Sequence, residues 1–356
     1  MNTMRVFFAG ASGAIGPPVV RELIERGHEV VAMTSSAAKV PLLADLGAEP
    51  VVADAMDADA LMRAVRSARP DGVVNMMTRI PAKAFRPAHL RATNELRERG
   101  VRHLLDAAVA AGARRFVSES FFGVYGFGPY GRARTENDPI GHERNRGIQA
   151  IIDAIASSEG QLRAASQDQR IEGVSLRFGG FHGPLSPSTQ TMVELVRRRR
   201  LPVIGAHGAV MPTIELSDAA RAVVDALEGA PAGRVYNVCD DEPVAMDDYL
   251  SELARVIGLR HRATSRTGSS APRRRTWRRS WAARACRCPT RASRTSWVGA
   301  RATRPTARRS RCSVPPPISR RSARAGPGRW PRSAGSRAAS RCAAPTPAPG
   351  SSRRRR

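Results

Sequence analysis

Short apolar runs and longer helical segments alternate along the first half of the chain. The runs, rich in β-branched residues, predict strands at Arg5–Ala9, Glu29–Met33, Pro50–Ala53, Gly72–Asn75, Arg115–Ser118 and Val174–Phe178. The segments between them predict helices near 17–26, 37–46, 58–68, 88–111 and 143–158. Such alternation is typical of a parallel sheet that is covered by helices on both faces.

The helix expected near 88–111 has one apolar stripe, since its large apolar residues recur at helical spacing. They are Leu96, Val101, Leu104, Leu105 and Ala108. After residue 180 the pattern changes to three helices and one strand, at Thr191–Val196, Asp218–Leu227, Met246–Val256 and Val235–Val238. This order is compatible with a smaller lobe over the carboxyl edge of the sheet.

A glycine-rich turn, Gly10-Ala11-Ser12-Gly13-Ala14-Ile15-Gly16, joins the first strand to the first helix. Glycines at this spacing permit a tight turn and a close approach of the backbone to a pyrophosphate. The free N–H groups at the helix start attract the anion, and Pro17 suits the first helical turn. The turn therefore predicts a dinucleotide site.

The glycine spacing is G-x-x-G-x-x-G, and several later segments fit the same family. They are Val74-Asn75-Met76-Met77, Asn94, Val124-Tyr125-Gly126, Leu176–Pro184, Ile214–Ala220 and Val235–Val238 with Glu242-Pro243. In this order they resemble the extended branch of the short-chain dehydrogenase/reductases, the NAD(P)-dependent epimerase/dehydratase family. The resemblance runs from Met4 to about Gly258.

The resemblance implies a Rossmann-type, doubly wound parallel sheet in residues 1–180 and a substrate-binding lobe in 181–260. The lobe's elements are expected to interleave with the sheet. The resemblance also implies a homodimer formed through the helices near 88–111 and 143–158. The implied cofactor-binding residues are Gly10, Ser12, Gly13, Ala14, Ile15, Gly16, Ser35, Lys39, Asp54, Ala55, Asn75, Met76 and Met77.

The end of the second strand bears on the choice of cofactor. An acid there would accept hydrogen bonds from the ribose and repel a 2′-phosphate. Instead the strand ends in Thr34-Ser35-Ser36, with Lys39 shortly after. Hydroxyls and one ammonium favour NADP over NAD, although Lys39 could also be an ordinary solvated helix residue.

The catalytic pair of the resembled family is missing. Its Tyr-x-x-x-Lys cannot occur here, because the only lysines are Lys39 and Lys83. Phe121 stands at the position of the usual serine, with Ser120 beside it. Weak substitutes for an acid or base are Ser120, Tyr125, Tyr130 with Arg134 four residues on, and His182.

Substrate contacts are expected after the sixth strand, at Phe181 and His182. Arg200, the last of four consecutive arginines, is a candidate for a diphosphate; a solvated helix end is the alternative. No His/Cys pattern predicts a metal site.

The charge is divided unevenly along the chain. Residues 261–356 hold 27 arginines and no Lys, Asp or Glu, so the net charge of +27 belongs entirely to them. Residues 1–260 have 31 basic and 31 acidic side chains, which excludes nucleic-acid binding as the role of the globular part. The tail, rich in Arg, Pro, Ser and Ala, is expected to be disordered and could bind nucleic acid non-specifically.

The tail is better explained as translation in the wrong frame. Codons for residues 285–310 shifted by one base can encode M-P-L-P-N-A-R-L-K-D-E-L-G-W-R-P-R-Y-P-T-Y-R-E-A-L. This resembles the N-x-x-x-K-x-x-L-G-W-x-P-x-Y close of the extended family.

The sequence thus predicts an NAD(P)-dependent oxidoreductase or epimerase/dehydratase acting on a small hydroxy or keto substrate, or on a nucleotide sugar. A redox-silent NADP-binding or regulatory protein is the alternative, and a nucleic-acid-binding protein the weaker third. Without a signal h-region or an uninterrupted apolar span of about 18 residues, a cytoplasmic protein that does not enter the membrane is expected.

Overall fold

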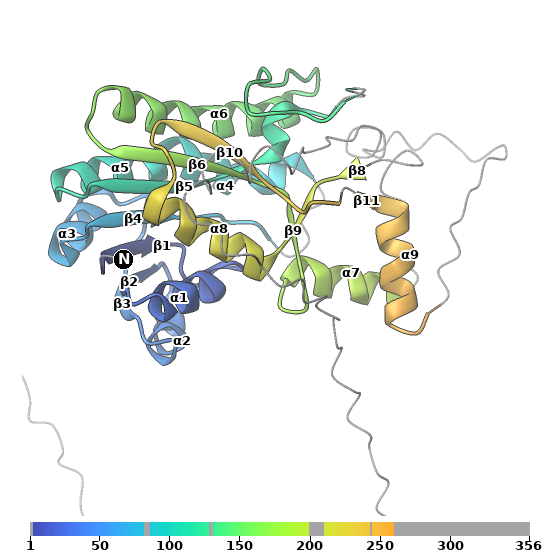
Figure 1. Ribbon diagram of the computed structural model, residues 1–356, viewed down its shortest axis with the longest axis horizontal. Coiled ribbons are helices and arrows are strands. Elements are labelled where there is room, and N and C mark those ends of the chain that lie inside the picture. The colour runs from blue at the N-terminus through green and yellow to red at the C-terminus, as the bar shows by residue number, and fades with distance from the viewer. Residues whose placement is uncertain are drawn as a thin grey trace, which may run out of the picture. The chain divides into compact units, whose positions relative to one another are not determined.

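The computed structural model describes residues 3–81, 86–127, 130, 132–198, 210–242 and 244–259. Its centre is a parallel sheet of seven strands, in the order β10-β6-β5-β4-β1-β2-β3 (Figure 1). The strands are β1 (Arg5–Ala9), β2 (Glu29–Thr34), β3 (Glu49–Val52), β4 (Gly72–Asn75), β5 (Arg115–Phe121), β6 (Glu172–Phe178) and β10 (Arg234–Val238). All seven predicted strands are confirmed within a few residues.

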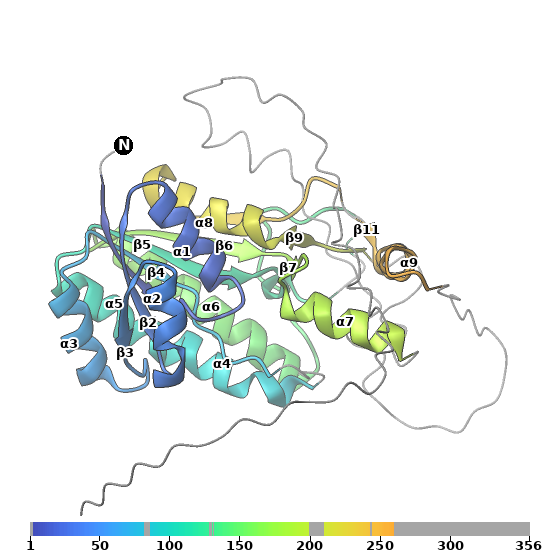
Figure 2. The ribbon, with the colours of Figure 1, turned by 90° about the horizontal axis from the view of Figure 1, so that it is seen from below.

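Helices cover both faces of the sheet, which gives the Rossmann-type fold expected (Figure 2). One face packs against α1 (Gly16–Glu25), α2 (Val40–Asp45) and α8 (Leu216–Gly229). The other packs against α3 (Ala58–Ala68), α5 (Val101–Ala110) and α6 (Arg146–Gln167). The central strands β1, β4, β5 and β6 are buried on both sides, and polar residues of β4, β5 and β6 are buried with the apolar ones.

The predicted helix near 88–111 is divided. It consists of the 3-10 turn Pro87–Leu90, α4 (Arg91–Glu95), a π-helical turn at Leu96–Gly100 and α5. Leu96 and Val101 are five residues apart, and the wider π turn lets both lie on the buried face. The whole predicted stripe is buried.

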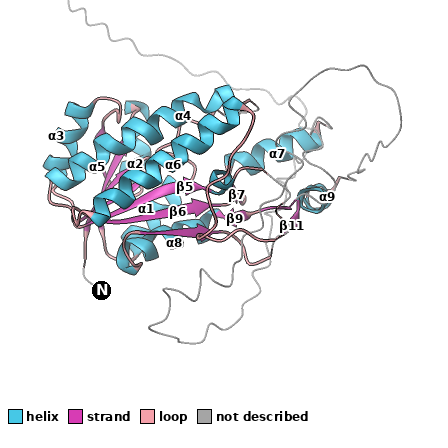
Figure 3. Cartoon of the chain, turned by 90° about the horizontal axis from the view of Figure 1, so that it is seen from above, coloured by secondary structure: helices cyan, strands magenta, loops and turns pink. Residues whose placement is uncertain are grey.

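Four short strands form two further pairs. β7 (Gly180–His182) runs parallel to β9 (Thr213–Glu215), and β8 (Val210–Met211) is antiparallel to β11 (Val244–Ala245). Figure 3 shows β7 and β9 beyond the carboxyl ends of β5 and β6, near α7 (Pro187–Arg197). α9 (Met246–Val256) follows β11 and contacts α7.

The strand predicted at Val235–Val238 joins the main sheet. It is β10, which pairs with β6 as an edge strand. The lobe is therefore interleaved with the sheet in space. The boundaries 1–180 and 181–260 remain predictions, and residues 261–356 lie outside the described residues.

Candidate cofactor and substrate site

Two glycines of the first turn lie where no side chain fits. Gly10 has a φ of +91°, and a Cβ on it would lie 2.6 Å from the carbonyl carbon of Met76. A Cβ on Gly16 would lie 1.9 Å from the carbonyl oxygen of Ala11. Gly13 differs, because its Cβ would meet only the carbonyl oxygen of Gly10, at 3.2 Å, and the residue is exposed. Gly10 and Gly16 thus shape the turn, and Gly13 leaves its outer surface open.

The start of α1 is suited to an anion. Ile15 precedes the helix without a side-chain hydrogen bond to its N-terminal N–H groups, and no acidic residue lies in the first turn. Pro17 and Pro18 occupy positions where the missing N–H groups are not needed. The Gly16 N–H already donates to the Gly13 carbonyl at 3.1 Å, so the first turn favours an anion through the helix dipole and not through free N–H groups of its own. The residues present fit the pyrophosphate of a dinucleotide through this dipole and the exposed glycine turn before it.

Ser12 and Lys39 connect the glycine turn to the end of β2. The Ser12 hydroxyl lies 2.9 Å from the Thr34 hydroxyl, and the Lys39 ammonium donates to the Ser12 carbonyl at 3.2 Å. Thr34 is buried, whereas Ser35 and Lys39 are exposed. The two predicted residues Ser35 and Lys39 thus present a hydroxyl and a cation to solvent beside the turn.

Asp54 forms an ion pair that sequence reasoning missed. Both carboxylate oxygens accept from Arg79 Nη2, at 3.1 and 3.2 Å. The Met56 N–H and Arg79 together lower the pKa of Asp54 below its ordinary value. The one signal of this ion pair in the sequence was the position of Arg79, four residues after the strand that ends at Asn75. Ala55 is buried beside this pair.

Asn75, Met76 and Met77 end β4 next to the glycine turn. All three are buried. The Asn75 amide donates to the Ser118 hydroxyl at 2.9 Å, and its oxygen accepts from the Met77 N–H at 3.2 Å. The Met76 N–H donates to the Ala9 carbonyl at 2.9 Å. This strand end is therefore held against β1 and β5, where the predicted cofactor would pass.

Tyr125 and Ser120 belong to a buried network. The Tyr125 hydroxyl lies 2.8 Å from Asn237 Oδ1 and accepts from Arg177 Nη1 at 2.7 Å. Burial raises the pKa of Tyr125 well above its ordinary value, against the opposing effect of Arg177. Ser120 donates to Glu159 at 2.5 Å. Neither group has the setting of a base, because the phenol is held neutral and the serine is already paired.

Tyr130 and Arg134 are in contact, which their spacing in a loop did not guarantee. The Arg134 guanidinium lies over the Tyr130 ring, 3.8 Å from its centre. The Tyr130 hydroxyl donates to the Tyr125 carbonyl oxygen. Arg134 therefore stacks on the ring face, so this contact is a cation–π pair.

The substrate candidates after β6 point to opposite faces of β7. The Phe181 ring packs on the core and lies 5.3 Å from the Phe178 ring. His182 is partly exposed, with Nε2 2.9 Å from Asp240 Oδ2. Arg200 lies outside the described residues.

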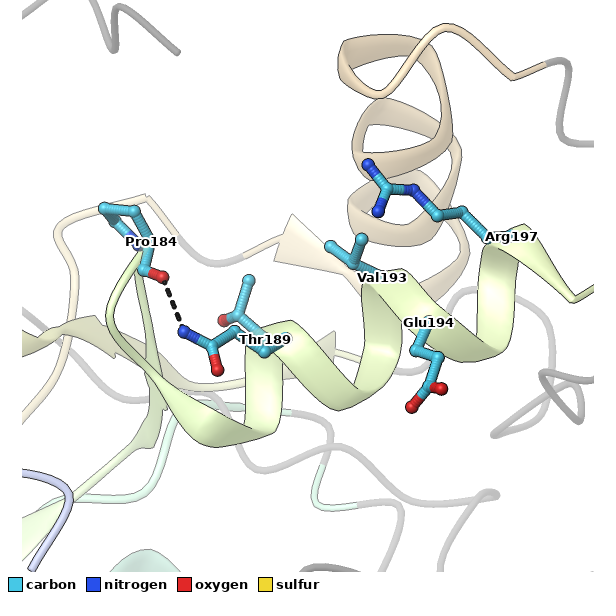
Figure 4. Close-up of a pocket in the computed structure, with 6 residues that line it drawn as sticks. Pro184, Thr189, Val193, Glu194 and Arg197 are labelled. Carbon is cyan, nitrogen blue, oxygen red and sulfur yellow. Dashed lines mark hydrogen bonds between the residues drawn. The ribbon is translucent and has the colours of Figure 1, made fainter. Parts of the chain in front are cut away.

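A shallow cleft of about 270 Å³ follows α7 close to these residues (Figure 4). Thr189, Val193 and Arg197 of this helix line the cleft. At its end, the Gln190 side chain donates to the Pro184 carbonyl at 3.2 Å. Arg197 is thus the one member of the arginine run at 197–200 that lines this described cleft. Within the ranges that the structure describes, no cluster of three His, Cys, Asp or Glu suits a metal ion. Among the same residues, no helix is both long and apolar enough to cross a membrane.

Comparisons with known proteins agree with this geometry. The profile described as the NAD dependent epimerase/dehydratase family matches residues 6–239. A 3-diazoavenalumate denitrifying reductase from Streptomyces sp is 35% identical over 260 residues, which is 72% of this chain and 82% of the relative. A 2-alkyl-3-oxoalkanoate reductase from Stenotrophomonas maltophilia is 26% identical over 263 residues, covering 72% and 76%.

A solved structure has the same fold. The UDP-glucose 4-epimerase of Thermus thermophilus, in complex with NAD, superposes with a TM-score of 0.64 and 24% sequence identity. The match covers 79% of this chain and 90% of the epimerase. At this level of identity the likeness supports the fold alone.

Proposed function

This chain belongs to the NAD dependent epimerase/dehydratase family, and we propose that it is an NADP-dependent reductase of a small carbonyl substrate. The observation that carries the cofactor choice is at the end of β2. There Ser35 and Lys39 are exposed beside the glycine turn, and no acid would repel a 2′-phosphate. When bound, NADPH would supply a hydride.

Reduction is favoured over epimerisation by the relatives. Both relatives compared above carry the name of a reductase. The chain must work without the Tyr-x-x-x-Lys pair, since neither of its two lysines follows a tyrosine at that spacing.

A redox-silent NADP-binding protein is the second candidate. It is favoured by the burial of Tyr125 and by the pairing of Ser120 with Glu159, which leave the usual tyrosine and serine roles unfilled at these positions. The two candidates share the cofactor site and differ only in turnover.

The test has two stages on the full chain. Titration of NADPH and NADH, followed by nicotinamide fluorescence, measures cofactor choice; tighter binding of NADH would contradict the NADP assignment. Absorbance at 340 nm then follows NADPH oxidation with 3-oxo acids, aryl ketones and an arenediazonium salt. Turnover of a 3-oxo acid or an aryl ketone supports the carbonyl reductase, whereas turnover of the diazonium salt alone would contradict a carbonyl substrate. Binding of NADPH with no turnover and no interconverted product supports the redox-silent candidate.

We also propose a homodimer through α4, α5 and α6. Among the described residues, the large exposed apolar side chains lie elsewhere: Leu42, Val52, Ile80, Ile140, Leu185, Val244, Val256 and Leu259. An interface on these helices would therefore be mainly polar. Sedimentation equilibrium of the full chain tests this, and a monomer at micromolar concentration would contradict it.

A further inference from the structure

A histidine–aspartate pair lies in the segment that follows β6. His182 Nε2 and Asp240 Oδ2 are 2.9 Å apart. The same carboxylate oxygen accepts from the Thr213 hydroxyl at 2.8 Å, and the Asp240 N–H donates to the Thr213 carbonyl at 2.7 Å. Asp240 is therefore fixed twice by one residue of β9, so it can hold the imidazole in one orientation.

Strand pairing explains how these residues meet. Gly180 pairs with Thr213 and His182 with Glu215 in the parallel β7–β9 ladder. Partners in such a ladder share a face, so His182 and Thr213 lie on the same side. The alternate residues, Phe181 and Ile214, pack against the core. The polar face with His182 is thus the face turned away from the core.

The pair is accessible, unlike the buried Tyr125. The side chains of His182 and Asp240 are 27% and 29% exposed. A carboxylate only accepts hydrogen bonds, so Nε2 carries the proton shared with Asp240. Nδ1 makes no hydrogen bond to any residue in the described ranges. That nitrogen is therefore available to a ligand.

The position of the pair fits a substrate site. β7 begins two residues after β6 ends, so His182 lies just beyond the carboxyl end of a parallel strand. In open α/β sheets, ligands bind outside the carboxyl ends of the strands. The cleft along α7 begins at Pro184, two residues after His182.

We propose that His182 is the proton donor of the reduction, taking the place of the missing tyrosine, with Asp240 and Thr213 as positioning residues. This inference rests on the proposed reductase function. When bound, NADPH would supply the hydride for the carbonyl carbon, and the C=O π electrons would pass to the oxygen. That oxygen would take a proton from Nδ1 of the His182 imidazolium. The imidazole is left neutral and regains its proton from water.

Three titratable groups of the described chain face His182. Two of them are acids, Asp240 and the ladder partner Glu215. The Glu215 carboxylate lies beside Gly183, the residue after His182: a Cβ added to that glycine would be 2.7 Å from Oε1. The Tyr249 ring of α9 is 6.1 Å from the imidazole, and its pKa is raised, chiefly by burial.

The experiment compares His182→Gln, Asp240→Asn and Thr213→Val in the full chain, using NADPH and a carbonyl that the wild type reduces. Glutamine can still donate to Asp240 but cannot act as an acid near neutral pH. We expect H182Q to lower kcat by about 100-fold or more, with the NADPH Kd changed less than about twofold. D240N should lower kcat by about tenfold with the NADPH Kd unchanged, because the carboxylate that accepts from Nε2 and orients the imidazole is lost. T213V should show a smaller loss of kcat that Thr213→Ser restores.

A readout independent of turnover is the NMR spectrum of the His182 imidazole in the chain without cofactor. The Nε2–H signal, which reports the hydrogen bond to Asp240, should change in D240N. The matched control is Glu228→Gln, which alters another histidine–carboxylate pair, His28 Nε2 and Glu228 Oε1 at 3.1 Å. E228Q should lower stability and leave the pH profile unchanged.

The proposal is overturned if H182Q keeps kcat within about threefold of wild type with the same pH profile. An unchanged Nε2–H signal and an unchanged kcat in D240N would refute the positioning role of Asp240. Failure of the wild type to bind NADPH would refute the proposed function instead, and fluorescence titration separates that result from a lost proton donor.

Discussion

Arg177 and Glu159 form a two-point ion pair inside the protein, between β6 and α6. Arg177 Nε and Nη2 donate to the two Glu159 oxygens at 2.7 and 2.6 Å, and the side chains are 4% and 5% exposed. Ser120 and Tyr125 complete the contacts of this pair. Ser120 and Tyr125, two of the predicted catalytic candidates, thus hydrogen-bond a buried ion pair.

Removing one charge of this pair should be costly. We predict that Glu159→Gln lowers the free energy of unfolding by about 3–5 kcal/mol, because Arg177 would keep a buried charge without its counterion. Urea unfolding followed by circular dichroism measures the change. The exposed pair Arg255–Glu252 supplies the control, since Glu252→Gln should leave the urea midpoint unchanged. Equal effects of the two substitutions would show that burial of the first pair is unimportant.

The three glycines of the first turn should respond differently to alanine. Gly13→Ala should fold normally but weaken NADPH binding about tenfold or more, since its Cβ enters the open surface that a pyrophosphate would approach. Gly10→Ala and Gly16→Ala should lose stability as well as binding, because their Cβ atoms would overlap backbone atoms. Thermal unfolding and fluorescence titration separate the two effects. Tight NADPH binding by G13A would place the pyrophosphate elsewhere.

Lys39 should decide between the two dinucleotides. We predict that Lys39→Ala weakens NADPH binding about tenfold, which corresponds to about 1.4 kcal/mol, and leaves NADH binding unchanged. The effect should shrink as salt is added, because Lys39 is exposed and its charge is screened. Arg21→Ala, elsewhere on the surface of α1, provides a control for the loss of a positive charge. An equal loss for both cofactors would mean that Lys39 does not contact the 2′-phosphate.

Tyr125 should make stability depend on pH in the alkaline range. Its pKa is raised by burial, so the folded protein keeps the phenol neutral while the unfolded chain ionises near the ordinary value of 10.0. The contribution is therefore fully present below pH 10 and is lost as the pH rises above it. Tyr125→Phe should unfold more easily at pH 8, by about 1–2 kcal/mol, and lose less stability between pH 9 and 11. Parallel losses in the two proteins would contradict the raised pKa.

DNA sequencing tests whether the arginine-rich tail, residues 261–356, is translated in the wrong frame. We predict that sequencing across codons 255–315 shows a shifted frame whose product contains the Lys, Leu-Gly-Trp and Tyr segment. In that case the restored chain is the one to assay. If the codons do not encode that segment, the tail is genuine, and salt-dependent binding to DNA that is lost on truncation after Arg260 becomes the expected result.

The sequence by itself determined the parts of the protein that are local. The positions of β1, β2, β4 and β10 follow from short apolar runs. The glycine turn follows from residue spacing that only one backbone path satisfies. The buried stripe of α5 was also readable, because burial imposes a helical period on the residues themselves.

Only the tertiary structure decided the rest, because those contacts join residues far apart in the chain. The place of β10 at the edge of the main sheet rests on its pairing with β6 across 60 residues, which no local pattern records. The contacts of Asp54 with Arg79 and of His182 with Asp240 likewise depend on which loops share a sheet edge. Tyr125, a candidate base by its motif, is excluded from that role by neighbours from β6 and β10 that bury it and keep it neutral.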